Sequence, residues 1–334
     1  MSTVDVVIPC YRYAHFLPQC VGSVIDQSVR DLRVLIIDDA SPDNTAEVAA
    51  ALMARDSRIT VLRHRTNKGH IYTYNEGIEW ASSDYFLLLS ADDFLCSGAL
   101  ERSASVLDAY PTVGFTFGRV VELNNDGHTS DLPCRVDVIA DAPWRLMSGA
   151  EFISVSGAKN IVGPPTAVVR TSLQKRLGGY RQELPHSGDM EMWLRLAAHS
   201  SVGFINAVQA VYRRHSGNMS LDYAPNRLPD ILQRKAAFDC FFDSCGSLLS
   251  DREAIRNRLY WLLACDTVSL ASSAFNEHQI TLADEVAQLA LSTHPKIRWS
   301  RHWIKFMCKR LLGPAAWRGL GPAISRIRRT RPGC

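Results

Sequence analysis

The sequence lacks the glycine-rich motifs that bind phosphate groups in many nucleotide-binding proteins. It contains no G-x-x-x-x-G-K-[ST] segment, and no G-x-G-x-x-G segment follows its first apolar run. Because the backbone N–H groups of these loops cradle phosphates, kinase-type and dinucleotide-binding functions lose their main support. If the chain binds a nucleoside diphosphate, a divalent cation must balance the charge of the phosphates.

Paired cysteines are also absent. The nine cysteines are scattered through the chain, their number is odd, and no two of them form a C-x-x-C pair. This usage favours neither a disulfide framework nor a zinc site and is typical of a reducing cytosol. The first residues enter an apolar, strand-like run at once, without the pattern of a signal peptide. We therefore expect a cytoplasmic protein.

The sequence also lacks a long apolar run, and it lacks acidic residues in its last segment. No stretch reaches the ~18 consecutive apolar residues that a membrane-spanning helix needs. Acidic residues are missing from residues 296–334, which hold eleven Lys or Arg, whereas the rest of the chain has 26 bases and 34 acids. A basic segment on an acidic body indicates an anionic partner for that segment alone.

Aromatic side chains are interleaved with these bases, at Trp299, Trp303, Phe306 and Trp317. This composition predicts a helix that lies on an anionic membrane surface, here the inner face of the cell membrane. In the alternative interpretation, the aromatic side chains pack on the body and the bases point into water. Nucleic-acid binding is not expected, because the body is acidic and no recognition motif accompanies the segment.

Residues 1–120 alternate short β-branched or aliphatic runs with segments of helical periodicity. This alternation predicts an α/β fold with a mainly parallel sheet and helices on both faces, as in Rossmann-like nucleotide-binding folds. The predicted strands are Val4–Pro9, Arg33–Ile37, Ile59–His64, Tyr85–Leu89 and Val113–Glu122, and the predicted helices are His15–Gln27, Thr45–Arg55, Ile71–Trp80 and Ser97–Tyr110.

The pattern changes along the second half of the chain. Polar residues 129–143 are typical of a loop or a small excursion from the sheet. The elements predicted after them are helices at Gly149–Ser156 and Met190–Ala198 and strands at Thr166–Arg170 and Val202–Tyr212. From about residue 229 only helical periods remain, at 229–246, 251–274 and 279–292. We therefore predict an α/β domain over residues 1–222, a helical region over 223–295 and a basic tail over 296–334.

Polar residues follow the predicted parallel strands, where open α/β sheets bind their ligands. Asp and Asn before helices are often ordinary caps. Two acidic pairs at one sheet edge, Asp38-Asp39 and Asp92-Asp93, are better explained by a cation, a ribose or a proton-transfer step, because adjacent carboxylates repel. Carboxylates at a strand end suit Mg²⁺ or Mn²⁺ shared with substrate phosphates.

Five segments occur in the order that is typical of family 2 glycosyltransferases: VVIPCYRYAHFLPQCVGSVIDQS, IIDDASPDNT, NKG, LLLSADDF and GDMEMWLRLA. Through them, residues 3–218 resemble that family. The resemblance implies the A-type glycosyltransferase fold (GT-A) for a catalytic domain over residues 1–222, followed by a helical C-terminal region. It also implies sugar transfer that inverts the anomeric configuration.

The same resemblance assigns the residues that bind the donor nucleotide. The segment from Pro9 to Tyr11 and the carboxylate of Asp39 would hold the base and the ribose. An aromatic face and a hydrogen-bond acceptor suit these groups. Asn67 and Gly69 would belong to the loop that closes over the nucleotide.

Ser90, Ala91 and Asp92 match the D-x-D motif of the family, in which the first acid contacts the ribose and the last binds a metal ion. Ser90 replaces the first acid here. The resemblance therefore implies that Asp92 binds Mg²⁺ or Mn²⁺ and that the ribose contact is made by a hydroxyl or weakened. His215 matches a histidine that lies beside the metal and the diphosphate in many relatives, although a lone histidine is often structural.

Asp189 matches the catalytic base of the inverting enzymes. The glutamate that usually precedes this base is replaced by Gly188. In the alternative interpretation, Asp189 only caps the helix that follows it. As a base it would remove the proton of the acceptor hydroxyl, and one carboxylate suffices because a metal-bound diphosphate leaves without a general acid.

The resemblance thus implies a metal-dependent glycosyltransferase of the hexosyltransferase type. Its donor would be a UDP-, dTDP- or GDP-linked sugar, and its acceptor a saccharide or lipid-linked hydroxyl in surface polysaccharide or glycolipid assembly. Ser90 and Gly188 motivate an alternative, a non-catalytic sugar-nucleotide-binding or scaffold protein with a decayed site. A phosphoacceptor receiver domain is disfavoured, because His64 and Arg65 stand where its third strand would end in Asp.

Overall fold

The computed structural model describes residues 2–124, 127–131, 136, 142–219, 227–313 and 317. The chain divides into two compact units. One contains residues 1–222 and 236–252, and the other contains residues 223–235 and 253–334. The first unit holds the sheet, and the second is helical. The division of the chain at residues 222 and 295 stays a prediction.

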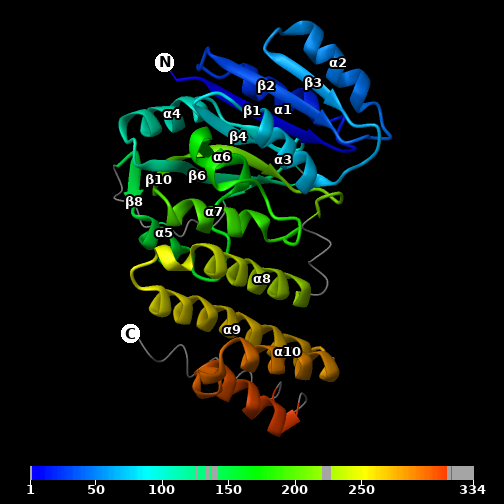
Figure 1. Ribbon diagram of the computed structural model, residues 1–334. Helices are drawn as coiled ribbons and strands as arrows, with labels where there is room; N and C mark the ends of the chain where they lie inside the picture. The colour runs from blue at the N-terminus through cyan, green and yellow to red at the C-terminus, as the bar shows by residue number, and fades with distance from the viewer. Residues whose placement is uncertain are drawn as a thin grey trace. The chain divides into compact units, whose positions relative to one another are not determined.

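The described part of the first unit contains a ten-stranded sheet in the order β3-β2-β1-β4-β9-β6-β10-β5, with β7 beside β6 and β8 beside β10 (Figure 1). The six strands that run in one direction are β1 (Val4–Cys10), β2 (Leu32–Asp38), β3 (Ile59–Arg63), β4 (Tyr85–Leu88), β6 (Val113–Leu123) and β10 (Ser201–Arg213). The mainly parallel sheet predicted from the sequence is therefore confirmed.

Four short strands run in the opposite direction: β5 (Phe94–Leu95), β7 (Thr129–Asp131), β8 (Trp144–Met147) and β9 (Val168–Arg170). β9 pairs with both β4 and β6 and so joins the two parallel parts of the sheet. The sequence predicts β9 but not the other three, which are too short to show an alternating pattern. At the start of residues 129–143, for which the sequence predicts a loop or a small excursion from the sheet, β7 pairs with β6.

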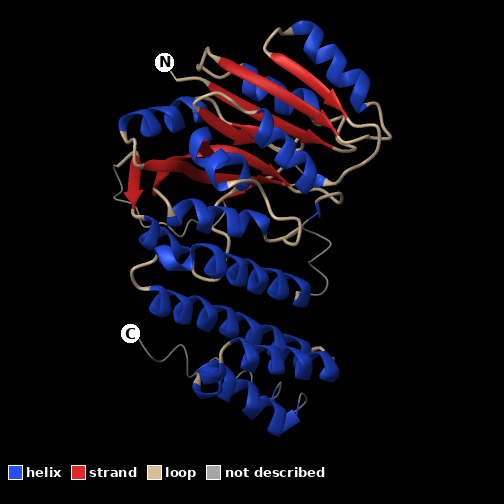
Figure 2. Cartoon of the chain, viewed as in Figure 1, coloured by secondary structure: helices blue, strands red, loops and turns tan. Residues whose placement is uncertain are grey.

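Helices lie on both faces of this sheet (Figure 2). Val6 and Ile8 of β1 point into a core that is shared with α1, α2 and α4. Val7 points to the other face, where it contacts α3 so closely that a Cβ at Gly77 would lie 2.4 Å from its Cγ1. The helices are α1 (Leu17–Ile25), α2 (Thr45–Arg55), α3 (His70–Trp80), α4 (Ala99–Ala109), α5 (Gly149–Ser156), α6 (Thr171–Leu177) and α7 (Gly188–Ala198).

The second unit is built from α9 (Arg252–Asn276), α10 (Ile280–Thr293), the 3₁₀ turn η4 (Pro295–Trp299) and a helix over residues 301–313, while α8 (Leu228–Cys245) contributes to both units. Ile297 and Phe306 are fully buried in a core with α9 and α10, and Trp303 packs against it. Among the described residues, no helix is long and apolar enough to cross a membrane.

Candidate active site

Asp39 connects the ends of β1 and β2 to the loop before α3. Its backbone N–H donates to the Cys10 carbonyl of β1, and its carboxylate accepts hydrogen bonds from the loop. Asp39 is 4% exposed. Its Oδ1 accepts a hydrogen bond from the backbone N–H of Lys68 at 2.7 Å, and its Oδ2 accepts one from Gly69 at 2.9 Å. The side-chain amide of Asn67 donates to the Asp39 carbonyl at 3.2 Å. Asp39 therefore holds the N-terminus of α3, where a negative charge is favourable.

A buried histidine also contacts Asp39. His64 Nδ1 lies 2.6 Å from Asp39 Oδ1, and His64 Nε2 lies 2.5 Å from Glu76 Oε2 on α3. A carboxylate has roughly four positions at which it can accept a hydrogen bond, and Lys68, Gly69 and His64 occupy three of them. One position remains for a nucleotide base or a ribose.

The backbone that presents Tyr11 is strained. Arg12 has a φ of 66° and Ala40 a φ of 55°, in the left-handed region that costs a non-glycine residue about 1–2 kcal/mol. The conformation is held because the backbone N–H of Arg12 donates to Ser41 Oγ at 3.1 Å. Tyr11 is 41% exposed, so it offers an aromatic face at the end of β1.

Asp92 follows β4 and lies against His215 and Asn218. Its Oδ2 accepts hydrogen bonds from His215 Nε2 at 3.1 Å and from Asn218 Nδ2 at 3.2 Å. Burial raises the pKa of Asp92, and the hydrogen bond from His215 only partly offsets that effect. The pKa of Asp93 is raised well above its usual value by burial and by the charge of Asp92. Two buried carboxylates with raised pKa values provide a place where a cation would be stabilised.

Asp92 fits a divalent cation that is shared with a ligand. Among the described residues, no three His, Cys, Asp or Glu side chains gather to hold a metal ion. Mg²⁺ and Mn²⁺ are commonly bound by one or two carboxylates together with substrate phosphates, which this arrangement allows.

The hydrogen bonds of His215 define its tautomer. The backbone N–H of Gly217 donates to His215 Nδ1 at 3.1 Å. Because a neutral imidazole carries one proton, Nε2 then bears the hydrogen that faces Asp92. As held here, this N–H donates to Asp92, so His215 would reach a phosphate oxygen only after turning from Asp92, and Nδ1 would ligate a cation only after releasing Gly217.

Asp189 is the second residue of α7. Ser187 occupies the N-cap position, and no side chain caps this helix, so the interpretation of Asp189 as a capping residue is wrong. Burial raises the pKa of Asp189 to about 6, while a hydrogen bond from Tyr180 and the charge of His186 act in the opposite direction. A carboxylate with such a pKa can accept a proton near neutral pH.

Two tyrosines that the sequence does not reveal lie between these carboxylates. The rings of Tyr74 and Tyr180 meet edge to face, with centroids 5.4 Å apart. Tyr180 donates to Asp189, whereas the Tyr74 hydroxyl is hydrogen-bonded to Ser90. The charges of both Asp189 and Asp92 act on Tyr74. Tyrosines inside a helix or a loop are usually packing residues, so no sequence signal marks them.

The remaining predicted site residues lie along the same edge. Pro9 is in β1, half-buried, beside Ile37 of β2. Ala91 is fully buried in the core, so only its backbone is available to a ligand. Apart from Pro9, which lies within β1, the predicted residues follow parallel strands, lie in the loop before α3 or belong to the first turn of α7.

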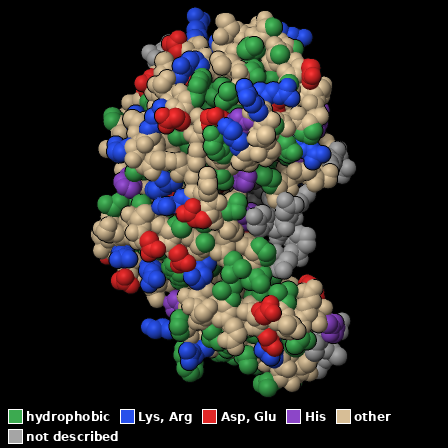
Figure 3. All heavy atoms as spheres, turned by 45° about the vertical axis from the view of Figure 1, so that its right-hand side comes forward, with side chains coloured by type: hydrophobic (Ala, Val, Ile, Leu, Met, Phe, Trp, Pro, Cys, Tyr) green, Lys and Arg blue, Asp and Glu red, His purple; other side chains and the backbone are tan. Residues whose placement is uncertain are grey.

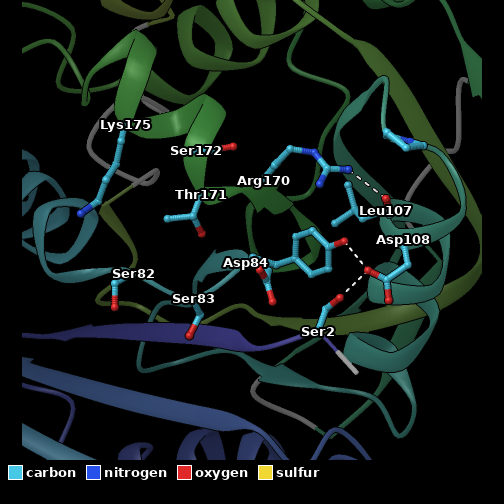
Figure 4. A pocket seen from close by; sticks show the side chains of 12 residues that line it. Ser2, Ser82, Ser83, Asp84, Leu107, Asp108, Arg170, Thr171, Ser172 and Lys175 are labelled. Carbon is cyan, nitrogen blue, oxygen red and sulfur yellow. Dashed lines mark hydrogen bonds between the residues drawn. The ribbon is translucent and has the colours of Figure 1, made fainter.

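A pocket of about 650 Å³ lies at the opposite edge of the sheet, where β4 begins and β9 ends (Figure 4). Its lining includes Asp84, Asp108 and Arg170. Asp108 accepts hydrogen bonds from Ser2 and from the Tyr85 hydroxyl, and Arg170 donates to the Leu107 carbonyl. No predicted site residue lines this pocket.

The structure is that of an α/β protein in which buried carboxylates lie at the carboxyl edge of a mainly parallel sheet, where folds of this class commonly bind ligands. The family model described as glycosyl transferase family 2 matches residues 5–161. The chain therefore carries a family 2 glycosyltransferase domain. Asp189 and His215 lie beyond the matched residues, so their roles depend on the geometry above.

Two curated relatives illustrate the similarity. Glycosyltransferase GlyG of Streptococcus pneumoniae is 30% identical over 98 residues, which are 29% of this chain and only 33% of GlyG. UDP-Glc:alpha-D-GlcNAc-diphosphoundecaprenol beta-1,3-glucosyltransferase WfgD of Escherichia coli is 22% identical over 275 residues, which are 82% of this chain and 96% of WfgD. The chain thus spans about a third of one relative and nearly all of the other.

Solved structures share the fold at low identity. S. aureus TarS 1-349 in complex with UDP-GlcNAc has a TM-score of 0.55 and 13% identity, over 88% of this chain and 92% of that one. Mannosyltransferase PcManGT from Pyrobaculum calidifontis, in complex with GDP-Man and Mn²⁺, has a TM-score of 0.54 and 17% identity, over 93% and 87%. The GT-A fold expected from the sequence is therefore confirmed.

Proposed function

We propose that the chain transfers a sugar from a nucleoside-diphosphate-sugar to an acceptor hydroxyl and inverts the anomeric configuration. The observation that carries this proposal is the pair of carboxylates with raised pKa values, Asp92 and Asp189, whose charges both act on Tyr74. Asp92 lies at a strand end that suits a cation and a diphosphate. Asp189 has a pKa of about 6, which suits a base.

In the proposed reaction, Asp189 removes the proton of the acceptor hydroxyl as the oxygen attacks the anomeric carbon. The bond to the diphosphate breaks in the same displacement, so no covalent glycosyl-enzyme is formed. Inversion follows because the attacking oxygen and the leaving oxygen are on opposite sides of the carbon.

The donor is bound by the other side chains of this edge. Tyr11 offers its ring to the base, Asp39 accepts one hydrogen bond from the base or the ribose, and His215 donates from Nε2 to a phosphate oxygen. Asp92 would hold Mg²⁺ or Mn²⁺. When bound, this cation would neutralise charge on the departing diphosphate.

The relatives support this class of donor. The TarS structure contains UDP-GlcNAc, and the PcManGT structure contains GDP-Man with Mn²⁺. We therefore propose a UDP-, dTDP- or GDP-linked hexose as donor. WfgD is described as acting on a diphosphoundecaprenol-linked sugar, which supports a lipid-linked acceptor in polysaccharide or glycolipid assembly.

Donor hydrolysis separates this enzyme from a non-catalytic sugar-nucleotide-binding scaffold. We expect slow hydrolysis of at least one donor in the presence of Mn²⁺, measured by release of the nucleoside diphosphate. Asp92→Asn should weaken Mn²⁺-dependent binding of that diphosphate at least about tenfold, because a carboxylate ligand is lost. Metal-independent binding in the wild type would contradict the role of Asp92, and binding of a donor without any turnover would favour the scaffold.

The helix over residues 301–313 supports a membrane location for the acceptor. Trp299, Ile304 and Leu311 are 77%, 53% and 85% exposed, whereas Phe306 is buried. Hydrophobic and basic side chains lie side by side on the visible surface of this region (Figure 3). Residues 296–313 contain six Lys or Arg and no acid. We propose that this face contacts anionic lipid on the cytoplasmic side.

The buried Phe306 and the packed Trp303 support the interpretation that the aromatics pack on the body, whereas the exposed apolar side chains support the proposed membrane contact. Beyond residue 313 the tail lies outside the described residues, except for Trp317. Leu311→Asn should weaken co-sedimentation with anionic vesicles. Leu248→Asn is the control, because Leu248 is also exposed, at 53%, but lies outside the basic segment. Equal loss in both variants, or in neither, would contradict the proposal.

A further inference from the structure

Gly188 and Ser90, the two departures from the family motifs, each lie beside one of the paired tyrosines. A Cβ at Gly188 would lie 3.3 Å from Tyr180 Cδ1 and 3.8 Å from Ile71 Cδ1. The first distance is tighter than ordinary van der Waals contact, so Gly188 gives the Tyr180 ring its full space. At the other departure, Ser90 is hydrogen-bonded to the Tyr74 hydroxyl.

The backbone of Tyr180 is fixed independently of its side chain. Asn75 on α3 donates from Nδ2 to the Tyr180 carbonyl at 2.9 Å and accepts from the Tyr180 N–H at 2.6 Å. Gly179 allows this contact, since a Cβ there would lie 2.1 Å from Asn75 Oδ1. The ring is 7% exposed and packs edge to face on Tyr74. A buried phenol held at both backbone and ring is a preorganised hydrogen-bond donor.

We propose that Tyr180 is a positioning residue for Asp189, taking the space that Gly188 leaves where the family motif has a glutamate. This inference depends on the proposed role of Asp189 as the base. The Tyr180 hydroxyl donates to the Asp189 carboxylate and orients it toward the acceptor. Tyr180 packs on Tyr74, and Tyr74 is hydrogen-bonded to Ser90, so the two rings connect the base to the donor side.

The groups around Asp189 are consistent with this role. Tyr180 and His186, from the loop before α7, stabilise its charged form, whereas burial opposes it. Tyr74 faces it from α3, and Arg195 of α7 acts on Tyr180. Tyr180 is the group that donates a side-chain hydrogen bond to Asp189, so its loss should favour the protonated acid.

Tyr180→Phe tests the proposal, because it removes the hydroxyl and keeps the ring. We expect the acidic limb of the kcat profile to move up by about one pH unit, since a hydrogen bond to a charged group is lost. At pH 6.5 kcat should fall about threefold, most of it should return by pH 9, and the KM for the donor should stay within about twofold. Gly188→Ala should give a smaller shift in the same direction by displacing the ring.

Tyr85→Phe is the matched control. Tyr85 donates to Asp108 at 2.5 Å, at the opposite edge of the sheet, and its removal should leave the pH profile unchanged. An unmoved acidic limb in Tyr180→Phe, or an equal loss of kcat at every pH, would overturn the positioning role. The proposed function fails separately, if Asp189→Asn remains active.

Discussion

At the edge of the sheet where the parallel strands begin, Asp5 accepts five hydrogen bonds from Arg33, Ser82 and Ser83. At the edge where they end, Asp189 is half-buried and accepts a hydrogen bond from Tyr180. Burial alone would raise the pKa of Asp5, yet its donors outweigh that effect and lower it. The pKa of Asp189 is instead raised to about 6.

The same contrast extends to other carboxylates. Asp108 at the first edge has a lowered pKa, because hydrogen bonds from Ser2 and Tyr85 outweigh its burial. Asp92 and Asp93 at the second edge have raised pKa values, chiefly through burial. Desolvation raises the pKa of all these carboxylates, even of the exposed Asp108, and the supply of hydrogen-bond donors distinguishes the two edges. The carboxylates that stabilise the fold have enough hydrogen-bond donors to offset desolvation, whereas those proposed for chemistry do not.

The largest expected effect is at Asp189. Asp189→Asn should lower transfer by about 10²–10⁴-fold, because the amide cannot accept the acceptor proton. Affinity for the donor should change less than about twofold. Steady-state kinetics and titration with a nucleoside diphosphate measure the two quantities. Transfer at the wild-type rate would remove Asp189 from the reaction.

The same substitution should stabilise the fold. The pKa of Asp189 rises from 3.8 to about 6 on folding, so its contribution to stability is lost as the pH rises through this window. Above pH 6 the buried charge destabilises the native state, and removing it should raise the melting temperature. A lower melting temperature of Asp189→Asn at pH 8 would contradict this, because it would show that hydrogen bonds and nearby charges stabilise the ionised Asp189 in the native state.

Asp5→Asn should destabilise the fold and leave kcat unchanged, which is the opposite of what Asp189→Asn should do. The amide places N–H groups against backbone donors, and loss of this buried, charge-assisted cluster should lower the free energy of unfolding by about 3 kcal/mol. Denaturant titration measures this loss. The kcat of the remaining folded protein should match that of the wild type. A large fall in kcat with normal stability would erase the distinction between the edges.

The pH dependence gives an effect of intermediate size. Because Asp189 must be ionised to act as a base and its pKa is about 6, kcat should fall below that pH. At pH 5 the ionised fraction, and with it kcat, should be about tenfold lower than the plateau value. A rate profile between pH 5 and 8, taken with saturating donor, checks this. A flat profile would contradict the assigned pKa.

The carboxylates where the parallel strands end can be predicted from the sequence better than those where the strands begin. Acidic pairs after apolar strands identify Asp39 and Asp92, since strand ends form one edge of a parallel sheet. Tyr180 and His64 escape such reasoning, because their contacts to Asp189 and Asp39 join segments whose approach only tertiary packing determines. Asp5 gives no signal either, since a single acid at the start of a strand is unremarkable.

The smallest expected effect is at Asp84, which lines the pocket where the strands begin. Its Oδ2 accepts from the backbone N–H of Thr3 at 2.8 Å and from the Thr3 hydroxyl at 3.0 Å. These bonds are exposed to water, so Asp84→Asn should cost only about 0.5–1 kcal/mol of stability. It should leave kcat and the KM for the donor unchanged. Asp84 precedes β4 and Asp189 lies in α7, at opposite ends of the parallel strands, so a fall in kcat at Asp84 comparable to that at Asp189 would show that catalysis uses both edges.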